Sequence, residues 1–352
     1  MTKKAVRLYI ETLRDDYLSP LQEGFDWVGV QSFLKWGDKV CVKPNLTFPT
    51  FRKGVMTNPT AVEAVVVHLK NFTNNITICE SDSGGYNRFS MDEVFRKTGI
   101  AELAKRHGVG ICNMSYMESR PVSCQIGRKS LSIPLAKFLL DGTDLFVTMP
   151  VPKVHANTIV SVALKNQWGL IQEPALRLKL HPFFKETIYE INKALPRTIA
   201  IVDGKYGLNR IGPLKGDVVD LGWVLISDNL FVTDLVVSEL MGFDWRTIPY
   251  LRYAFERAGI KSLEGVELNR DYLDFKKDKF FLRRKWENYP GWLAFRSSWL
   301  AYIAYHSRFS AALHWVFNLF SKPFFDYAGE RARLKPPAQG PGGAPAGGTT
   351  PS

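Results

Sequence analysis

The strongest constraint on the fold is an alternation of short, almost continuously apolar runs with longer segments of helical periodicity, which extends over residues 5–260. Short apolar runs rich in β-branched residues are typical of buried parallel strands. Alternating strand and helix patterns predict an α/β fold, because parallel strands need a crossover connection between them. The runs predicted as strands are 5–10, 39–42, 76–79, 144–149, 198–202 and 223–227.

Helix boundaries can be recognised between these runs. Asn58-Pro59 places a capping residue before a first-turn proline, and the helix continues to residue 69. Ser90 and Glu93 match a capping box before a second helix. Further helices are predicted over 157–164, 181–194 and 229–241, the last with Gly242 as its C-terminal cap. We therefore expect an open, mostly parallel sheet with helices on both faces.

Two changes in composition divide the chain. The strand pattern ends near residue 260, so an α/β domain is predicted over residues 1–260. Residues 261–335 are basic and aromatic, and we expect a helical extension there. Residues 336–352 hold five proline and five glycine residues without a large apolar side chain. Such a segment cannot bury enough surface to offset its chain entropy, so a disordered tail is predicted.

The formal net charge of +12 favours an anionic partner, which can be a phosphate-bearing ligand, a nucleic acid or an anionic membrane. The four cysteines lack CxxC spacing, so neither a zinc ribbon nor an iron–sulfur cluster is expected within the chain. We expect Cys41, Cys79, Cys112 and Cys124 to be reduced, buried thiols. The first residues lack a long apolar stretch and a cleavage site, which predicts a cytoplasmic protein.

Polar and ionisable residues follow five of the predicted strands at the point where each strand ends. Ligands of open parallel sheets bind beyond the carboxyl ends of the strands, so we expect these residues to share one crevice. The five segments are Lys43-Pro44-Asn45, Glu80-Ser81-Asp82-Ser83, residues 150–157, Asp203-Gly204 and Asp228.

The loop after strand 76–79 combines acidic residues with glycines. Gly84 and Gly85 permit close approach of the backbone to a ligand, and the helix start that follows favours an anion. The loop matches neither the dinucleotide-binding nor the Walker spacing, and a glycine turn with an aspartate cap explains it equally well. Glu80 and Asp82, two residues apart, can share a metal ion or a substrate hydroxyl group.

Lys153 and His155 lie two residues apart in a predicted loop and can point into the same crevice. Lysine neutralises a carboxylate or phosphate as a point charge, and histidine carries a proton near neutral pH or ligates a metal. Lys165 ends the following helix, where a cation also suits the helix dipole. His181 opens another helix, where capping or surface exposure is the simpler role.

The order of these motifs resembles an uncharacterised family, numbered 362 among the domains of unknown function. The resemblance covers roughly residues 38–250 and implies an α/β domain and a site, but no substrate. Some members carry a fused ferredoxin-like cluster domain; this chain lacks the cysteine cluster, so the resemblance implies a separate iron–sulfur redox protein as a partner. The matching pieces are Lys43-Pro44-Asn45-Leu46, Asn58-Pro59, Glu80-Ser81-Asp82-Ser83, Pro152-Lys153-Val154-His155, Leu164-Lys165-Asn166, His181-Pro182, Ile191-Asn192, Val202-Asp203-Gly204, Asp228 and Asp234.

The extension combines a basic run with an aromatic series. Basic residues at 276, 277, 279 and 283–285 place six positive charges within ten positions. The aromatic residues Trp292, Phe295, Trp299, Tyr302, Tyr305 and Phe309 follow at steps of three or four, as on one face of a helix. Polar residues interrupt the apolar run too often for a bilayer span.

Two interpretations of this helix remain open. It can pack on the α/β core, which we expect for Trp299, or it can lie at an anionic membrane surface, which we expect for residues 315–325. In the second case residues 276–325 form the membrane contact and the protein is peripheral at the membrane. Nucleic acid is not expected as a partner, because basic and aromatic residues are segregated rather than interleaved.

We therefore predict an enzyme that acts on an anionic small molecule, a carboxylate or a phosphate, with a divalent metal as a further hypothesis. The predicted catalytic residues are Lys43, Asp82, Lys153 and His155; the predicted substrate-binding residues are Asn45, Ser83, Gly84, Lys165, Asn166 and Asp203; the hypothetical metal ligands are Glu80, Asp82, His155 and His181. Lys43 and Lys153 hold the anion, His155 moves a proton, and Asp82 is a base or metal ligand. The alternatives are a non-catalytic protein that binds a ligand or a membrane surface, and a partner subunit of a separate redox protein.

Overall fold

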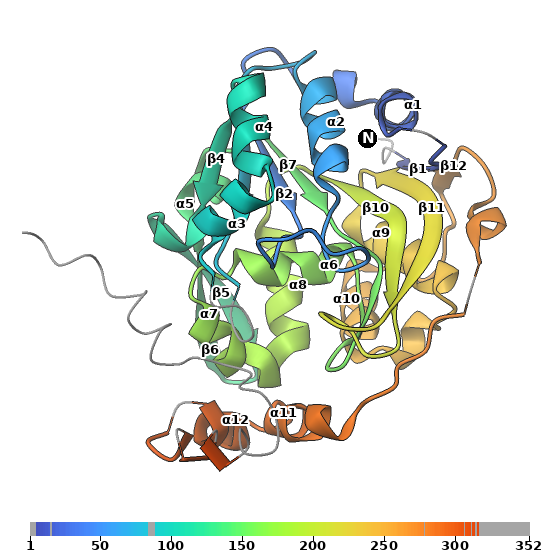
Figure 1. The fold of residues 1–352 in the computed structure, drawn as a ribbon. Helices are drawn as coiled ribbons and strands as arrows, with labels where there is room; N and C mark the ends of the chain where they lie inside the picture. Colours follow the sequence, from blue (N-terminus) through green and yellow to red (C-terminus); the bar gives the residue numbers. More distant parts are fainter. Residues whose placement is uncertain are drawn as a thin grey trace, which may run out of the picture.

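A ten-stranded sheet forms the centre of the protein and carries helices on both faces (Figure 1), which confirms the predicted α/β fold. The computed structural model describes residues 5–14, 16–83, 89–277, 279–305, 307–310, 312–313 and 315–316. Gly84 and the predicted tail 336–352 lie outside the described residues.

The main path of the sheet has the order β12-β1-β11-β10-β7-β2-β3-β4. Its strands are β1 (Val6–Thr12), β2 (Val40–Pro44), β3 (Ile76–Glu80), β4 (Gly110–Asn113), β7 (Leu145–Met149), β10 (Thr198–Asn209), β11 (Asp217–Ser227) and β12 (Val266–Leu268). Strand β11 runs antiparallel to both of its neighbours, and the other pairs on this path are parallel. The expected mostly parallel sheet is thus present, with one reversed strand.

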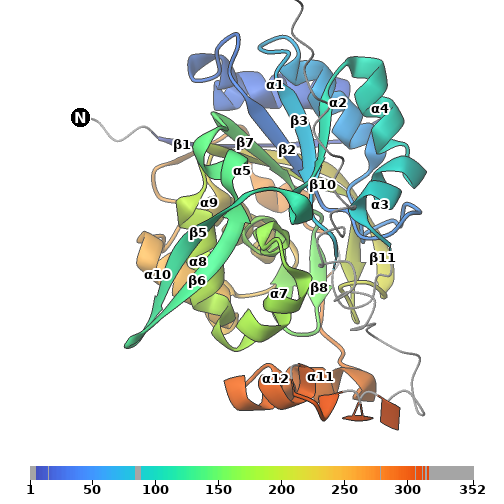
Figure 2. The same cartoon turned by 90° about the vertical axis from the view of Figure 1, so that its left-hand side faces the viewer.

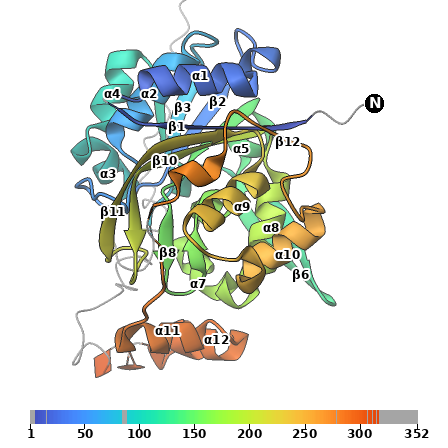
Figure 3. The ribbon, with the colours of Figure 1, turned by 90° about the vertical axis from the view of Figure 1, so that its right-hand side faces the viewer.

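Two apolar cores lie on opposite faces of this sheet, with the sheet between the two helical layers (Figure 3). The alternation along β2 shows why: Val40 and Val42 enter one core, whereas Cys41 enters the other. One layer contains α1 (Leu18–Val28), α2 (Pro59–Leu69), α3 (Met91–Lys97) and α4 (Ile100–His107); the other contains α6 (Ala163–Asn166), α7 (Pro174–Leu180), α8 (Phe184–Ala194), α9 (Leu230–Leu240) and α10 (Pro249–Ala258).

The two predicted N-terminal helix caps are confirmed, whereas the C-cap of α9 is Met241 and not Gly242. The side chain of Asn58 accepts a hydrogen bond from the backbone N–H of Thr60, at 3.1 Å, at the start of α2. Ser90 caps α3 by accepting from the backbone N–H of Glu93 at 3.3 Å. Asn229 caps α9 in the same way. Capping is a local interaction, which is why the sequence alone indicated it.

The predicted helix over 157–164 is wrong. The chain forms a hairpin there, β8 (Lys153–His155) and β9 (Ile159–Ser161), before the four-residue helix α6. Strand β8 pairs with the extended β10, and pairing of this kind overrides a weak local helical pattern. The hairpin of β5 (Ser119–Ile126) and β6 (Lys129–Ala136), like the short helix α5 (Lys137–Asp141), has no counterpart among the predicted elements.

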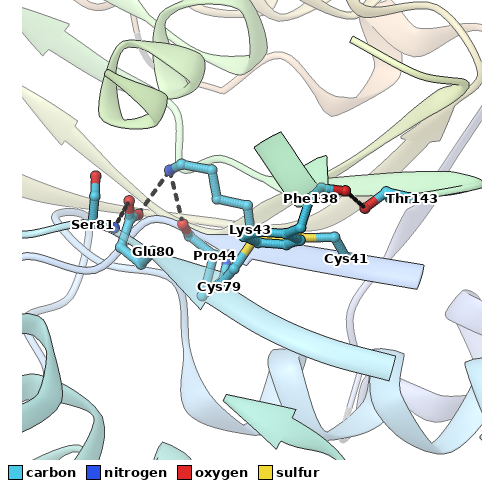
Figure 4. The surroundings of a disulfide bond; sticks show 8 residues. All are labelled: Cys41, Lys43, Pro44, Cys79, Glu80, Ser81, Phe138 and Thr143. Carbon is cyan, nitrogen blue, oxygen red and sulfur yellow. Dashed lines mark hydrogen bonds and ion pairs between the residues drawn. A yellow bond between two sulfur atoms is a disulfide. The ribbon is translucent and has the colours of Figure 1, made fainter. Parts of the chain in front are cut away.

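Two of the four cysteines are not reduced thiols. Cys41 of β2 and Cys79 of β3 form a disulfide, which Figure 4 shows, while Cys112 and Cys124 are free. The two strands are parallel neighbours, and the Cα atoms of Cys41 and Cys79 lie 6.5 Å apart, which permits a bond. The sequence could not indicate this pairing, because it depends on strands that are neighbours in space only.

The segment after residue 260 contains a strand, contrary to the prediction. Strand β12 pairs in parallel with β1, and the following chain crosses back over β10. Phe280 is 1% exposed there, and its ring packs over Gly207 of β10. The backbone N–H of Arg283 donates to the carbonyl oxygen of Arg210 at 2.9 Å. The division of the chain into domains itself stays a prediction.

The aromatic series forms two short helices rather than one, α11 (Tyr289–Ala294) and α12 (Ser298–Tyr305), shown in orange below α7 in Figure 2. Trp299 is 67% exposed, so the expectation that it packs on the core is wrong. Trp315 is exposed as expected, and residues 317–325 lie outside the described residues. Among the described residues no helix is long and apolar enough to cross a membrane.

The buried Phe280 should anchor this crossing segment to the sheet. We expect Phe280→Ala to lower the free energy of unfolding by about 3–5 kcal/mol, the usual cost of removing a buried aromatic side chain. The matched control is the neighbouring Phe281→Ala, which removes a ring that is 47% exposed and should change stability by no more than about 0.5 kcal/mol. Chemical denaturation measures both variants. Equal losses in the two would contradict the anchoring role.

Candidate functional site

The carboxyl ends of β2, β3 and β7 meet at one edge of the sheet, as their register requires. Lys43 and Glu80 lie at the ends of β2 and β3, and the hairpin β8–β9 follows β7 closely. Asp228 does not join them. Since β11 is antiparallel, its last residue Ser227 pairs with Ala200 near the start of β10, so Asp228 lies at the opposite edge.

A buried ion pair joins two of these strand ends. The Nζ atom of Lys43 lies 2.7 Å from an Oε atom of Glu80, as the dashed line in Figure 4 shows. Nζ also lies 3.3 Å from the carbonyl oxygen of Pro44 and 3.5 Å from Oδ1 of Asn166. Lys43 is 1% exposed, and this burial lowers its pKa, while Glu80 opposes the shift.

Six basic side chains interact electrostatically around this pair, and we call them the basic cluster. Strands β2 and β8, helices α6 and α7 and the 3-10 turn His181–Phe183 contribute them. Glu80 favours the charged forms of Lys43 and Lys153. The members of the basic cluster are Lys43, Lys153, His155, Lys165, Arg177 and His181.

Burial and mutual repulsion lower the pKa values within the basic cluster. Burial, and then the positive charge of Lys43, lower the pKa of Lys153 to about 7. Burial, and then Lys153 and other cations, lower the pKa of Lys165 to about 7 as well. The pKa values of His155 and His181 fall well below the usual histidine value, again through burial and then Lys165. Lys153 and Lys165 therefore gain and lose protons near neutral pH, whereas His155 and His181 are uncharged at that pH.

Several proton donors of the basic cluster have no acceptor within the described part of the chain. Lys165 Nζ makes no hydrogen bond or ion pair there; it lies 5.6 Å from the ring centre of Trp168 and 5.3 Å from that of Phe184. Nδ1 of His155 accepts from the backbone N–H of Asn157 at 3.1 Å, so the neutral ring carries its proton on Nε2. Lys153 donates to the carbonyl oxygen of Val55 at 2.7 Å.

Aromatic rings form one side of the basic cluster. The ring of His181 stacks on Trp168, with 5.1 Å between centres and an interplanar angle of 5°. The ring of Phe295, just after α11, meets His181 edge to face at 4.1 Å. The extension therefore contacts the basic cluster, and aromatic rings border the hydrogen-bond donors next to His181.

Asp82, predicted as catalytic, lies at the same sheet edge but makes other contacts. Its Oδ1 accepts from the backbone N–H of Met91 at 2.6 Å and from Asn113 at 3.0 Å, and its Oδ2 accepts from Tyr116 at 3.1 Å. These bonds attach the carboxylate to the start of α3 and to the end of β4. The structure thus brings three predicted catalytic residues together, Lys43, Lys153 and His155, and holds Asp82 beside α3.

The predicted substrate-binding residues divide into two groups. Lys165 belongs to the basic cluster, and Asn166 contacts it through Lys43. The others bind the protein's own loops: Asp203 accepts from the Tyr17 hydroxyl and the Asn58 backbone N–H, both at 2.7 Å, Asn45 donates to Val55 at 3.2 Å, and Ser83 donates to Thr47 at 3.3 Å. Loop organisation is therefore the observed role of Asp203, Asn45 and Ser83.

Arg177 and Asp234 support the site, although neither was predicted as a site residue. Arg177 of α7 donates to the carbonyl oxygen of Asp82 at 2.8 Å and to Oγ of Ser81 at 2.6 Å, and so fixes the loop after β3. Asp234 is fully buried, not exposed to solvent; it accepts from the backbone N–H of Ala163 at 2.7 Å, at the start of α6. Burial raises the pKa of Asp234 to about 8. In the sequence, Arg177 can be recognised only as a charged residue within an apolar helical pattern.

The four hypothetical metal ligands do not form a common set of ligands around one point. No three His, Cys, Asp or Glu side chains of the described residues are arranged to hold a metal ion. Glu80 is paired with Lys43, Asp82 binds α3, and the two histidines lie among lysines that repel a cation. The donor set therefore fits an anion better than a divalent cation, and the metal stays a prediction.

Comparisons with known proteins agree with the order of motifs. Residues 40–239 match the family described as Domain of unknown function (DUF362). Thylakoid-associated protein sll1697 of Synechocystis sp. (strain ATCC 27184 / PCC 6803 / Kazusa) is 26% identical over 241 residues, which are 66% of this chain and 71% of that protein.

A crystal structure of a protein from Thermotoga maritima is also similar, with 14% sequence identity and a TM-score of 0.34. The match covers 60% of this chain and 55% of that one, so this chain spans little more than half of the solved protein. The family match, in contrast, extends over more than half of this chain and confirms the resemblance. The chain belongs to the DUF362 family.

Proposed function

We propose that this protein is an enzyme that binds an anionic small molecule, a carboxylate or a phosphate, at the basic cluster and exchanges a proton with it. One observation carries the proposal. Nζ of Lys165 and Nε2 of His155 have no acceptor within the described residues, although both side chains are at least half-buried. Neither atom is among the fully enclosed polar atoms that lack a partner, so both can be reached from outside, and a bound anion would replace water as their acceptor.

The charge balance supports the same proposal. The lysines of the basic cluster carry three formal positive charges; Glu80 favours the charged forms of Lys43 and Lys153, whereas the charged groups that act on Lys165 are all cations. Like charges in a poorly solvated place repel one another strongly, which is why the pKa values of Lys153 and Lys165 fall. An anion would relieve this repulsion and restore both pKa values upward.

The proposed roles follow from the contacts. Lys43 is held by Glu80 and Asn166, so it supplies a fixed positive charge. Lys153 and Lys165 have pKa values of about 7 and can give or take a proton near neutral pH. The backbone N–H of Asn157 holds the tautomer of His155, which presents its Nε2 proton to the ligand. In the non-catalytic alternative, the basic cluster binds the anion without converting it.

Association with an anionic membrane surface is a second candidate function. Trp299 and Tyr302 of α12 are exposed, and aromatic residues of this kind favour the boundary between lipid and water. The relative from Synechocystis is named thylakoid-associated, which supports a contact with membranes. A separate iron–sulfur redox partner rests on the family resemblance alone.

Sulfate binding tests the anion site. We expect isothermal titration calorimetry to detect sulfate binding to the whole protein, and Lys165→Gln to weaken it by about tenfold, the effect of losing one charged hydrogen bond. Lys193→Gln is the matched control, because Lys193 is an exposed lysine of α8. The control should bind as the unmodified protein does. Equal affinity in both variants would contradict the proposed site.

The affinity for sulfate should fall as the pH rises. Sulfate keeps its charge throughout the range, so the change reports the protein alone. Lys153 and Lys165 are fully charged below about pH 6 and lose their protons as the pH passes about 7, which removes attraction for the anion. Calorimetry at about pH 7.5 in two buffers of different ionisation enthalpy should show proton uptake on binding. An affinity that does not change between about pH 6 and pH 8.5 would exclude these lysines from the site.

A further inference from the structure

The segment that carries α11 and α12 contacts the basic cluster through Phe295 and exposes aromatic side chains on α12. From this double contact we infer that the anion is the head group of an anionic lipid, taken from a membrane surface on which α11 and α12 lie. The inference rests on the proposed anion site and adds the substrate class. It also joins the two candidate functions into one, because binding to the surface then delivers the ligand.

The inner contacts place the extension next to both histidines of the basic cluster. The ring of Phe295 lies 4.1 Å from the ring of His181 and stacks on Tyr305 at 5.2 Å. Nε of Arg284 donates to the carbonyl oxygen of Ala156 at 2.8 Å, immediately after His155. A molecule that settles on α11 and α12 is therefore adjacent to the two histidines of the basic cluster.

The outward side chains suit a lipid surface. Trp299 is 67% exposed and Tyr302 is 57% exposed, and both belong to α12. Exposed arginines accompany them, among them Arg296, whose guanidinium lies 3.8 Å from the centre of the Trp292 ring. Residues 290–325 contain no aspartate or glutamate. Aromatic rings beside uncompensated positive charge are complementary to anionic head groups above an apolar layer.

The boundary of the basic cluster suits an anion that carries an apolar part. Lys165 lies over the rings of Trp168 and Phe184, and His181 lies between Trp168 and Phe295. A free phosphate ion has no surface to place against these rings. A lipid offers both parts, since its head group can pair with the lysines while the adjoining glycerol and acyl chain contact the aromatic side.

Vesicle sedimentation tests the surface. We expect the whole protein to bind vesicles of phosphatidylcholine that contain phosphatidylglycerol, and not vesicles of phosphatidylcholine alone. The double variant Trp299→Ser with Tyr302→Ser should lose about tenfold in vesicle binding and keep its affinity for sulfate. Trp36→Ser is the matched control, because Trp36 is 70% exposed and precedes β2, at the other edge of the sheet. Loss of binding in the control as well, or no vesicle binding by the unmodified protein, would overturn the inference.

Soluble probes test the source of the anion. Dihexanoyl phosphatidylglycerol, kept below its micelle concentration, should compete with sulfate and bind about tenfold more tightly than glycerophosphoglycerol, which has the same singly charged head group without acyl chains. Lys165→Gln should weaken both. Equal affinity of the two probes would show that a free anion is the ligand, which overturns the inference and leaves the anion site intact. If sulfate and both probes fail to bind, the proposed function itself is wrong.

Discussion

The ion pair between Lys43 and Glu80 sets the charge of the whole sheet edge. A lysine that is 1% exposed retains a positive charge only beside a carboxylate, and Glu80 supplies one at 2.7 Å. That carboxylate is then already paired. Lys153 and Lys165 add positive charge around the pair, and the charged groups that act on Lys165 are all cations. The proposed anion site rests on this arrangement.

Two buried residues hold the basic cluster in position: Asp234, which lies outside the cluster, and Arg177, which belongs to it. Asp234 caps the short helix that carries Lys165, and Arg177 ties the loop after Glu80 to α7. Both bond segments that are distant in sequence, so the site depends on the packing of α9 and α7 against the sheet. A substitution at Asp234 would act on Lys165 through the backbone, whereas a substitution at Arg177 would also remove a positive charge from the basic cluster.

The sequence predicted what depends on neighbouring residues. The ends of β2, β3 and β7 and the caps of α2 and α3 carry local signals, and through the strand ends Lys43, Lys153, His155 and Lys165 could be expected to lie near one another. The hairpin at β8–β9, the Cys41–Cys79 bond and the reversed β11 depend on which strands are neighbours in space. Composition could not show that Asp82 and Asp203 bind the protein's own backbone, because an aspartate that caps a helix and one that binds a ligand look alike in sequence.

The extension also affects the solubility of the protein, because it contains strand β12. It covers three residues at one margin of the sheet by pairing Val6–Leu8 of β1 with Val266–Leu268. An uncovered strand margin is a template for pairing with another copy of the chain, and proteins avoid this by covering it. The extension that contacts the histidines of the basic cluster thus begins with a strand that covers the edge of the sheet. A chain that ends before β12 would lose the aromatic helices and would also leave the edge of β1 open to pairing with another copy of the chain.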